Sequence, residues 1–493
     1  MKYLLIFVFL FGLLGFQTQA QICIGSLGDP TVTQSFGTGT GVGPSLTADN
    51  TGLNYSGSDC PNDGNYVIVN KTSNCFGGSW HTVNEDHTPG DTNGYMMLVN
   101  AKNTPDIFYT FSVNNLCPNT TYELSSYIMN VRKASSPCSG NSTVSYPDIT
   151  FVVETENGQV IGSSNTGLIY ETNTPEWKKY GFFFKSPPNV SKVVLKLINN
   201  TLGGGCGNDL ALDDITFRPC GPTILANENS TISSSLTLCE GATQAYTFKA
   251  DVSSGYLKPA FLWQEDKHDG NDWVNIPNSS SSTYQALITN ADKKGYSYRM
   301  AAAEEENIAN SSCRVYSNVI EVKVVPSLVI DAGKDVYVLE NSATKILATA
   351  PPNLVYEWSP ATYLSDPHVL QPIVKPTETT IYTLTVTDLN SGCEAMAEVT
   401  VHVDQDIKIP DTFSPNGDGV NDLWQIQGLL GNSDVDITIF NRNGQKVYAA
   451  KGYPKAWDGK LKNNNLPQGM YYYIIDTHSP IRPLYRGSVL IIY

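Results

Sequence analysis

The loop from Asn416 to Asp422 combines oxygen-bearing side chains with glycines, a pattern that suits a hard cation. Asn416, Asp418, the Val420 carbonyl and Asp422 place oxygens on alternate residues, as at the start of an EF-hand-type calcium loop. The glycines between them permit positive φ, so these oxygens can converge. No glutamate follows to supply a bidentate closing ligand. Two hypotheses stand: a calcium site, or an uncharged turn held by its own hydrogen bonds.

A second polar loop starts at Trp80 and ends at Tyr95. Asp86, His87 and Asp91 could coordinate a cation, while Trp80 or Tyr95 could stack on the apolar face of a sugar. The alternative is a long ordered loop whose Asp and His side chains bind its own backbone. Nothing in the spacing is diagnostic, so we favour this second interpretation.

The overall charge bounds the kind of partner. The chain carries 31 Lys and Arg against 47 Asp and Glu, a formal net charge of −16. This excess of acid opposes binding to nucleic acid or anionic lipid and makes cations the more natural partners. Only 16% of the residues are charged, and long stretches alternate apolar with polar residues, as half-buried antiparallel strands do. We therefore predict an all-β protein.

The N-terminal residues 1–20 have the layout of a secretory signal peptide. Lys2 precedes a nearly continuous apolar run from Leu4 to Phe16, and a short polar exit ends in the small residue Ala20. The run is too short for a membrane-spanning helix, and no later segment approaches the required length. We expect cleavage after Ala20, export, and a mature chain without a transmembrane segment.

The ten cysteines of an exported chain are best explained as disulfides, because no CxxC pair occurs and the six histidines are scattered. Seven of them precede residue 221, and Cys239, Cys313 and Cys393 follow. Seven cysteines cannot all pair within one domain. At least one is then free, or it reaches Cys393 or another chain. The length of 493 residues indicates three or four domains at the usual ~100–200 residues each.

Four motifs occur in order near the C-terminus: Phe413–Gly419, Ile439–Gly444, Trp457–Gly459 and Gly469–Tyr473. Together they resemble the gliding-motility-associated C-terminal domain of Bacteroidetes secreted proteins, the type B sorting domain of the type IX secretion system. The resemblance covers residues 405–493 and implies a small β-sandwich. It also implies that the secretion machinery at the outer membrane reads this domain, which is then removed or attaches the protein to the cell surface.

A tryptophan and a later alternating strand mark the segment 327–404. Trp358 would pack against the alternate apolar residues of Tyr382–Val386, the pattern of a strand with one buried face. The segment resembles a PKD- or immunoglobulin-like sandwich. Many relatives pair a cysteine near Leu339 with the position of Cys393, and that cysteine is absent here, which leaves Cys393 free or bonded elsewhere.

The preceding segment, 222–326, resembles another immunoglobulin-like domain through Trp263, which fits the buried tryptophan of that fold. Met300 stands where the usual second cysteine would be. By pairing arithmetic alone, we predict a disulfide between Cys239 and Cys313. Both sandwiches are interpreted as spacers.

Any specific activity is then expected in residues 21–221. The strand Leu210–Phe217 resembles the last strand of galactose-binding-like jelly rolls, which include many carbohydrate-binding modules. In that fold an acidic residue of this strand commonly helps to hold a structural calcium, so the resemblance implies Asp213 and Asp214 as ligands. Adjacent strand residues point to opposite faces, so only one carboxylate would face a given site. Five further strands are expected at 108–113, 121–128, 149–153, 180–184 and 193–197.

The sequence contains no catalytic motif that we can identify, since neither GxSxG nor HExxH occurs. A jelly roll followed by two spacers and a sorting domain is organised like an adhesin. We therefore predict a secreted or surface-attached protein whose jelly roll binds a glycan or another surface ligand, with calcium as a structural cofactor. The alternatives are a structural surface or matrix protein that binds other proteins, and a polysaccharide hydrolase with cryptic carboxylates.

Overall fold

The computed structural model describes residues 22–47, 50–138, 143–202, 206–228 and 235–493. The predicted signal peptide lies outside these residues. The described residues contain no α-helix, only short 3-10 turns such as η2 (Cys75–Gly78) and η3 (Ser311–Cys313). The prediction of an all-β protein is confirmed.

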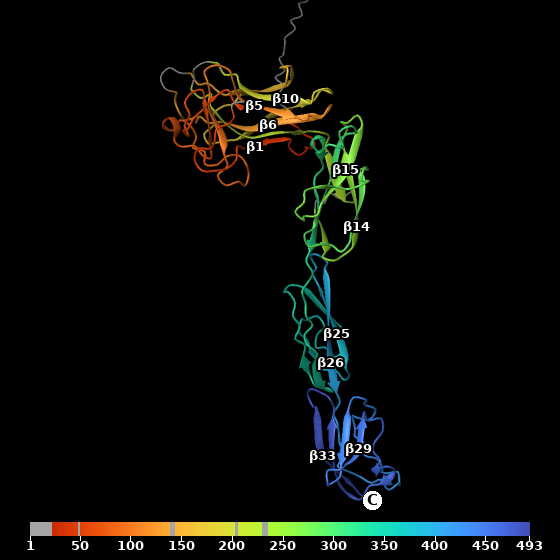
Figure 1. The fold of residues 1–493 in the computed structure, drawn as a ribbon. Helices are drawn as coiled ribbons and strands as arrows, with labels where there is room; N and C mark the ends of the chain where they lie inside the picture. The colour runs from red at the N-terminus through yellow and green to blue at the C-terminus, as the bar shows by residue number, and fades with distance from the viewer. Residues whose placement is uncertain (1–21, 48–49, 139–142, 203–205, 229–234) are drawn as a thin grey trace, which may run out of the picture. The chain divides into compact units, whose positions relative to one another are not determined.

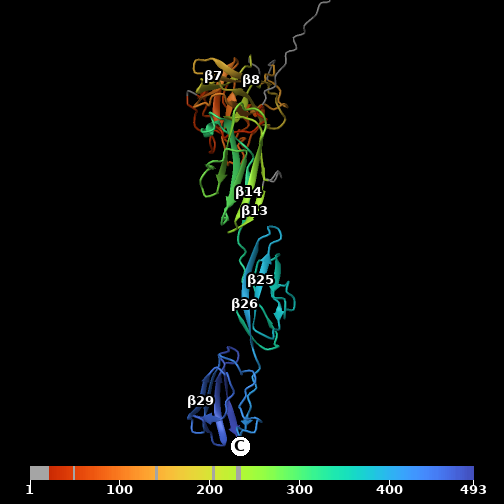
Figure 2. The same ribbon diagram turned by 90° about the vertical axis from the view of Figure 1, so that its right-hand side faces the viewer.

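The N-terminal part of the chain folds into two sheets, and β5 and β10 belong to one layer while β1 and β6 belong to the other (Figure 1). The first sheet has the order β2-β3-β4-β11-β6-β9, with β1 paired to β11, and the second has the order β5-β10-β7-β8. Figure 2 shows β7 and β8 side by side at the edge of the second sheet. The strands of the first sheet are β1 (Val32–Gln34), β2 (Asn54–Tyr55), β3 (Asn65–Val69), β4 (Met96–Asn100), β6 (Thr121–Asn130), β9 (Lys178–Lys185) and β11 (Leu210–Pro219). Those of the second are β5 (Asp106–Asn114), β7 (Asp148–Thr155), β8 (Val160–Leu168) and β10 (Lys192–Asn199).

Alternating side chains of these two sheets meet in one apolar core. Met97, Leu124 and Leu212 from the first sheet and Phe151 and Leu195 from the second are buried in the same cluster. Along β10 every second side chain is buried, as expected for a strand with one face on the core. The five strands predicted from alternation all exist, each extended by a few residues.

The next sandwich consists of a three-stranded sheet, β12-β14-β17, and a six-stranded sheet, β13-β20-β18-β15-β16 with β19 beside β18. Trp263 is fully buried against Phe248, as the sequence predicted for this tryptophan. The strands are β12 (Ile224–Glu228), β13 (Ser235–Cys239), β14 (Gln244–Val252), β15 (Pro259–Asp266), β16 (Val274–Asn275), β17 (Thr283–Ile288), β18 (Tyr296–Glu304), β19 (Val315–Tyr316) and β20 (Ile320–Val325).

The third group of strands forms a four-stranded sheet, β21-β26-β25-β23, and a two-stranded sheet, β22-β24. Trp358 packs with Tyr382, Leu384 and Val386 in its core, as predicted. The strands are β21 (Val336–Leu339), β22 (Thr344–Lys345), β23 (Val355–Ser359), β24 (Ile373–Val374), β25 (Thr380–Thr387) and β26 (Glu394–Asp404).

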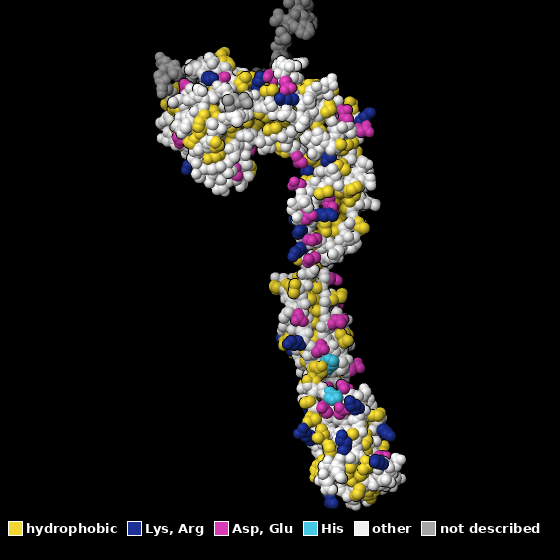
Figure 3. All heavy atoms as spheres, viewed as in Figure 1, with side chains coloured by type: hydrophobic (Ala, Val, Ile, Leu, Met, Phe, Trp, Pro, Cys, Tyr) yellow, Lys and Arg dark blue, Asp and Glu magenta, His cyan; other side chains and the backbone are white. Residues whose placement is uncertain are grey.

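The C-terminal strands form a five-stranded sheet, β27-β33-β32-β28-β29, and a two-stranded sheet, β30-β31. Trp424 and Trp457 lie edge to face in its core. On the face of the whole chain that Figure 3 shows, including these strands, basic and acidic side chains are interspersed within a largely uncharged surface. The strands are β27 (Thr412–Phe413), β28 (Asp436–Phe440), β29 (Lys446–Lys451), β30 (Lys460–Leu461), β31 (Asn464–Asn465), β32 (Gly469–Asp476) and β33 (Leu484–Ile491).

The chain divides into two compact units. The first contains the N-terminal sandwich and most of the next one, and the second contains the remaining strands to the C-terminus. The predicted division into domains at 21–221, 222–326, 327–404 and 405–493 is finer than this and stays a prediction.

The predicted disulfide between Cys239 and Cys313 is wrong. Cys313 lies on η3, is buried against the core of the N-terminal sandwich and bonds to Cys117 instead. Cys239 ends β13 and bonds to Cys393. Pairing arithmetic failed because it assumed that each domain closes its own disulfides. All ten cysteines are paired, in the disulfides Cys23–Cys220, Cys60–Cys75, Cys117–Cys313, Cys138–Cys206 and Cys239–Cys393.

Candidate metal centre

Strand β11 carries Asp213 and Asp214 on a β-bulge. Its pairing with β6 shifts register between Asp213 and Thr216, and Asp214 has a left-handed φ of 48°. The Ser126 hydroxyl donates to the Asp213 carbonyl at 2.7 Å, which fixes the irregular backbone. A bulge breaks the strict alternation of side chains. Both carboxylates therefore reach the same loop, and the prediction that they point to opposite faces is wrong.

That loop is the polar segment predicted from the sequence. The His87 backbone N–H donates to Asp213 Oδ2 at 2.9 Å, and His87 Nδ1 lies 2.8 Å from Asp214 Oδ2. The Thr88 hydroxyl donates to Asp214 Oδ1 at 2.8 Å. The His87 ring also stacks on Tyr127 of β6, with 3.4 Å between ring centroids. The candidate residues from the loop and from β11 thus form one site.

Two further carboxylates of the loop, Asp86 and Asp91, meet over Gly94. A Cβ built on Gly94 would collide with Asp86 Oδ2 and with both carboxylate oxygens of Asp91, so the site needs a glycine there. Asp86 Oδ2, Asp91 Oδ1 and Asp213 Oδ1 are buried atoms for which the described residues provide no hydrogen-bond partner. Buried carboxylate oxygens of this kind call for a proton or a cation.

The electrostatics of the site disfavour negative charge. Burial, followed by the neighbouring Asp91 carboxylate, raises the pKa of Asp86 from 3.8 to about 6. Burial also raises the pKa of Asp213 to about 8, although the hydrogen bond from His87 works against this rise. The negative charges of the Asp214 and Asp86 carboxylates also raise the pKa of Asp213, so these three groups are electrostatically coupled. Among the described residues of this site, the one ion pair is between His87 and Asp214.

The open carboxylate oxygens are of the chemical type that calcium binds, but too few of them converge to form a complete coordination site. Calcium takes six to eight oxygen ligands, and the open atoms of the site are carboxylate oxygens. Across the described part of the chain, however, no three His, Cys, Asp or Glu side chains are already placed to hold a metal ion. The site as described is a pair, Asp86 and Asp91, with Asp213 as an electrostatically coupled neighbour.

The two aromatic residues predicted as a sugar platform are buried. Trp80 is 3% exposed and is covered by Phe76, with 4.8 Å between the ring centroids. Tyr95 is 7% exposed and packs beneath the glycines Gly39 and Gly43. Neither ring offers an open face for stacking, so the stacking role predicted for them gains no support.

The C-terminal loop proposed as a calcium site satisfies its own carboxylates. Asp422 accepts from the N–H groups of Gly417 (2.6 Å) and Gly419 (2.8 Å). Asp418 accepts from the Val420 N–H at 2.7 Å and from the Asn416 amide at 2.9 Å. These bonds lower the pKa of Asp418, the one from Asn416 most. The geometry favours the hydrogen-bonded turn over a cation loop.

Sequence reasoning missed Thr88 and Gly94, although both lie in the loop that it singled out. Thr88 directly follows His87, and a hydroxyl there gives no signal until Asp214 is known to face it. Gly94 could have been suspected, because a glycine often marks a position where another group lies close to the backbone, here the carboxylates of Asp86 and Asp91.

The comparison with protein families concerns the C-terminal sheet. Residues 407–491 match the CHU_C Type IX secretion signal domain. The protein therefore carries a signal for export by the type IX secretion system, which implies an interaction with that machinery and an extracellular or cell-surface location. None of the curated proteins matches the chain. Among the described residues, no helix has the length and apolar character needed to cross a membrane.

Solved structures resemble the chain only distantly. The I-band fragment I67-I69 from titin is 11% identical, with a TM-score of 0.26, and the match covers 55% of this chain and 98% of that one. The apo form of a cyclase from Fischerella sp. is 15% identical, with a TM-score of 0.24, and the match covers 42% of this chain and 91% of the other. The CBM22-1 xylan-binding domain from Paenibacillus barcinonensis Xyn10C is 16% identical, with a TM-score of 0.22, and the match covers 40% of this chain and 97% of the domain. Likeness at this level has no implication for function.

Proposed function

We propose that this exported protein is an adhesin-like binding protein whose N-terminal sandwich binds a glycan or another surface ligand. The observation that carries the proposal is the cluster of unpartnered buried carboxylates in that sandwich, at Asp86, Asp91 and Asp213. Such atoms are rare in structural cores and mark sites where an ion or ligand completes the hydrogen bonding. The secretion signal supplies the location in which a surface ligand is met.

In this proposal the N-terminal sandwich is a galactose-binding-like jelly roll, and the following sandwiches are immunoglobulin- and PKD-like spacers. The cores around Trp263 and Trp358 support the spacer role, because these aromatic side chains are fully buried and unavailable to a ligand. We propose binding rather than catalysis, and release or surface attachment after the C-terminal domain has been read.

Calcium is the proposed structural cofactor of the N-terminal sandwich. Asp86, Asp91 and Asp213 would hold it through their open oxygens, with water or backbone carbonyls completing the set. The ion would supply the positive charge that the site lacks and so lock the loop onto β11. His87 and Thr88 keep their present role, because they orient Asp214 and one oxygen of Asp213.

The test is a glycan array probed with the exported protein in calcium and in chelator. Binding to a defined glycan supports the adhesin-like function, and loss of binding in chelator supports the calcium role. Co-purification with surface proteins and no glycan binding would favour a structural matrix protein instead. Release of reducing sugar from a polysaccharide would favour a hydrolase.

A further inference from the structure

A pocket of about 440 Å³ opens in the N-terminal sandwich, and its lining includes none of the carboxylates of the metal centre. Its volume lies within the range of small-molecule sites. The residues on which its chemistry depends are Phe76, Trp80, Asn100, Arg132, Asn208 and Asp209. Of this set, the sequence singled out Trp80 alone, for its predicted stacking role.

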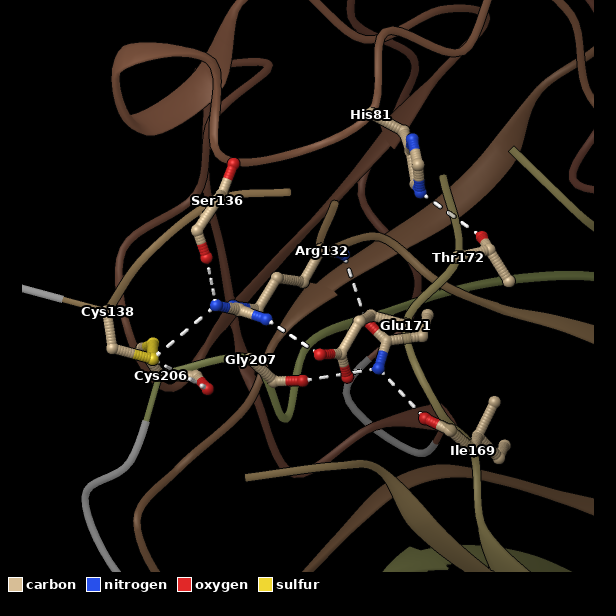
Figure 4. A network of polar contacts seen from close by, with 10 residues as sticks. His81, Arg132, Ser136, Cys138, Ile169, Glu171, Thr172, Cys206 and Gly207 are labelled. Carbon is tan, nitrogen blue, oxygen red and sulfur yellow. Dashed lines mark hydrogen bonds and ion pairs between the residues drawn. A yellow bond between two sulfur atoms is a disulfide. The ribbon is translucent and has the colours of Figure 1, made fainter. Parts of the chain in front are cut away.

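One disulfide and one ion pair restrain part of the wall of this pocket. Arg132 Nη1 donates to Glu171 Oε1 at 3.1 Å, and Arg132 Nη2 donates to the Ser136 carbonyl and contacts Cys138 Sγ, as Figure 4 shows. Cys138 is bonded to Cys206 on the neighbouring segment. These contacts restrain Arg132 and Cys138 before a ligand binds, which reduces the entropy cost of binding.

Phe76 supplies an aromatic face at the pocket. It is 48% exposed, although large aromatic side chains are normally buried, and it leans on the buried Trp80 ring. Its φ of 52° is left-handed, a sparsely populated region for a bulky residue, and such strain gathers at functional sites. The Cys60–Cys75 disulfide anchors the residue immediately before it. The fold thus holds an exposed ring in a fixed position.

Polar side chains on the pocket wall are oriented by the backbone. Asn100 donates through Nδ2 to the Pro61 carbonyl at 2.8 Å, and Asn208 donates through Nδ2 to the Lys102 carbonyl at 3.1 Å. Asp209 accepts from the Ala101 N–H at 3.0 Å. The Asp209 carboxyl also has a hydrogen bond with the Trp80 side chain. This carboxyl group and the two amides keep further capacity to bind hydroxyl groups.

The charge of the lining selects against anions. Its charged residues are Asp63, Arg132 and Asp209, and the guanidinium of Arg132 is already neutralised by Glu171. An acidic ligand would meet two acidic side chains and no unpaired cation in this lining. Burial raises the pKa of Asp209 to about 7, so this carboxyl group can donate as well as accept a hydrogen bond near neutral pH. A neutral ligand rich in hydroxyl groups therefore meets suitable partners and an aromatic face.

We propose that this pocket binds a neutral sugar residue, which stacks on Phe76 and hydrogen-bonds to Asp209, Asn100 and Asn208. The inference rests on the proposed glycan-binding function and names both the site and the chemical class of the ligand. The pocket shares no carboxylate with the proposed calcium centre, but the loop that the ion would hold supplies Trp80 to the pocket wall, so the ion would support the binding site.

The test compares variants of the full exported protein on an array of neutral and acidic glycans, in calcium. Phe76→Ala should weaken binding to neutral glycans at least about tenfold, as expected when an aromatic anchor is removed, and Phe76→Tyr should restore it. Phe183→Ala is the matched control, because Phe183 is 42% exposed on the same sandwich and lines a different pocket. It should bind as the wild type does.

The outcomes separate this inference from the proposed function. Neutral-glycan binding that survives Phe76→Ala would overturn the assignment of this pocket and leave the glycan-binding function standing. Preference for sialylated or uronic-acid glycans would overturn the inferred ligand class. No binding to any glycan would overturn both the inference and the glycan-binding part of the proposed function.

Discussion

Two acidic loops of this protein look alike in sequence and differ in structure. The loop near Asp86 packs against β11 and leaves buried carboxylate oxygens without partners among the described residues. The loop near Asp418 is exposed, and its carboxylates accept hydrogen bonds from its own N–H groups. Both have the Asp, Asn and Gly composition of a cation loop. We propose that burial and the supply of backbone N–H donors decide whether such a loop binds an ion.

Removal of calcium should change the stability of the N-terminal sandwich more than any other test of this comparison. Calcium at about 100 times its Kd stabilises the folded state by about 2.7 kcal/mol, so chelator should lower the melting temperature of the N-terminal sandwich by several degrees. Scanning calorimetry of the exported protein in calcium and in chelator measures this. Asp418→Asn should leave the shift unchanged, and a shift that disappears in this variant would place the ion in the C-terminal loop.

The pH dependence of stability should come next. Because the pKa values of Asp86 and Asp213 are raised in the folded state, to about 6 and about 8, these two carboxyl groups bind more protons in the folded protein than in the unfolded chain between about pH 4 and about pH 8. In chelator the free energy of unfolding should therefore fall as pH rises from about 4 to about 8. Urea melts at several pH values check this. Asp86→Asn should reduce the decrease in unfolding free energy at the lower-pH end of this range, below about pH 6. An unfolding free energy that rises from about pH 4 to about pH 8 would contradict the account.

Gly94→Ala should destabilise the N-terminal sandwich by about 1–3 kcal/mol, because the added methyl group collides with Asp86 and Asp91. Its matched control is Gly57→Ala, where a Cβ would meet nothing within 4 Å and the expected change is close to zero. Denaturant unfolding compares the two. Equal effects would show that Asp86 and Asp91 do not crowd Gly94.

The smallest effect is expected at the C-terminal loop. Asp422→Ala removes the acceptor of two exposed N–H groups and should cost about 1 kcal/mol or less. The loss should be the same in calcium and in chelator, measured on the transition of the C-terminal unit. A loss found only in calcium would reverse the comparison of the two loops.

Sequence patterns were sufficient for the strands, and they failed on the connections between distant segments. Alternation identified β5, β6, β7, β9 and β10 because each buries one face. The polar loop was singled out from its residue types and the acidic pair of β11 from a resemblance, and nothing in the sequence linked the two. Their meeting depends on a bulge, which no local pattern encodes, so the opposite-face prediction failed.

The disulfides and the pocket show the same limit. Cys117 and Cys313 are 196 residues apart, and only the packing of η3 on the N-terminal core brings them together. Phe76, Arg132 and Asp209 belong to three separate segments, so their convergence is a property of the tertiary fold. Trp80 was expected on the surface, but its large apolar ring is buried beneath Phe76.

The most direct test of the central claim is a calcium titration of the exported protein by calorimetry, with Asp213→Asn as its partner. The account predicts one calcium ion bound by the N-terminal sandwich of the wild type and none bound there by the variant, with the fold of both checked by circular dichroism. Equal calcium binding by the two proteins, or no binding by either, would contradict it.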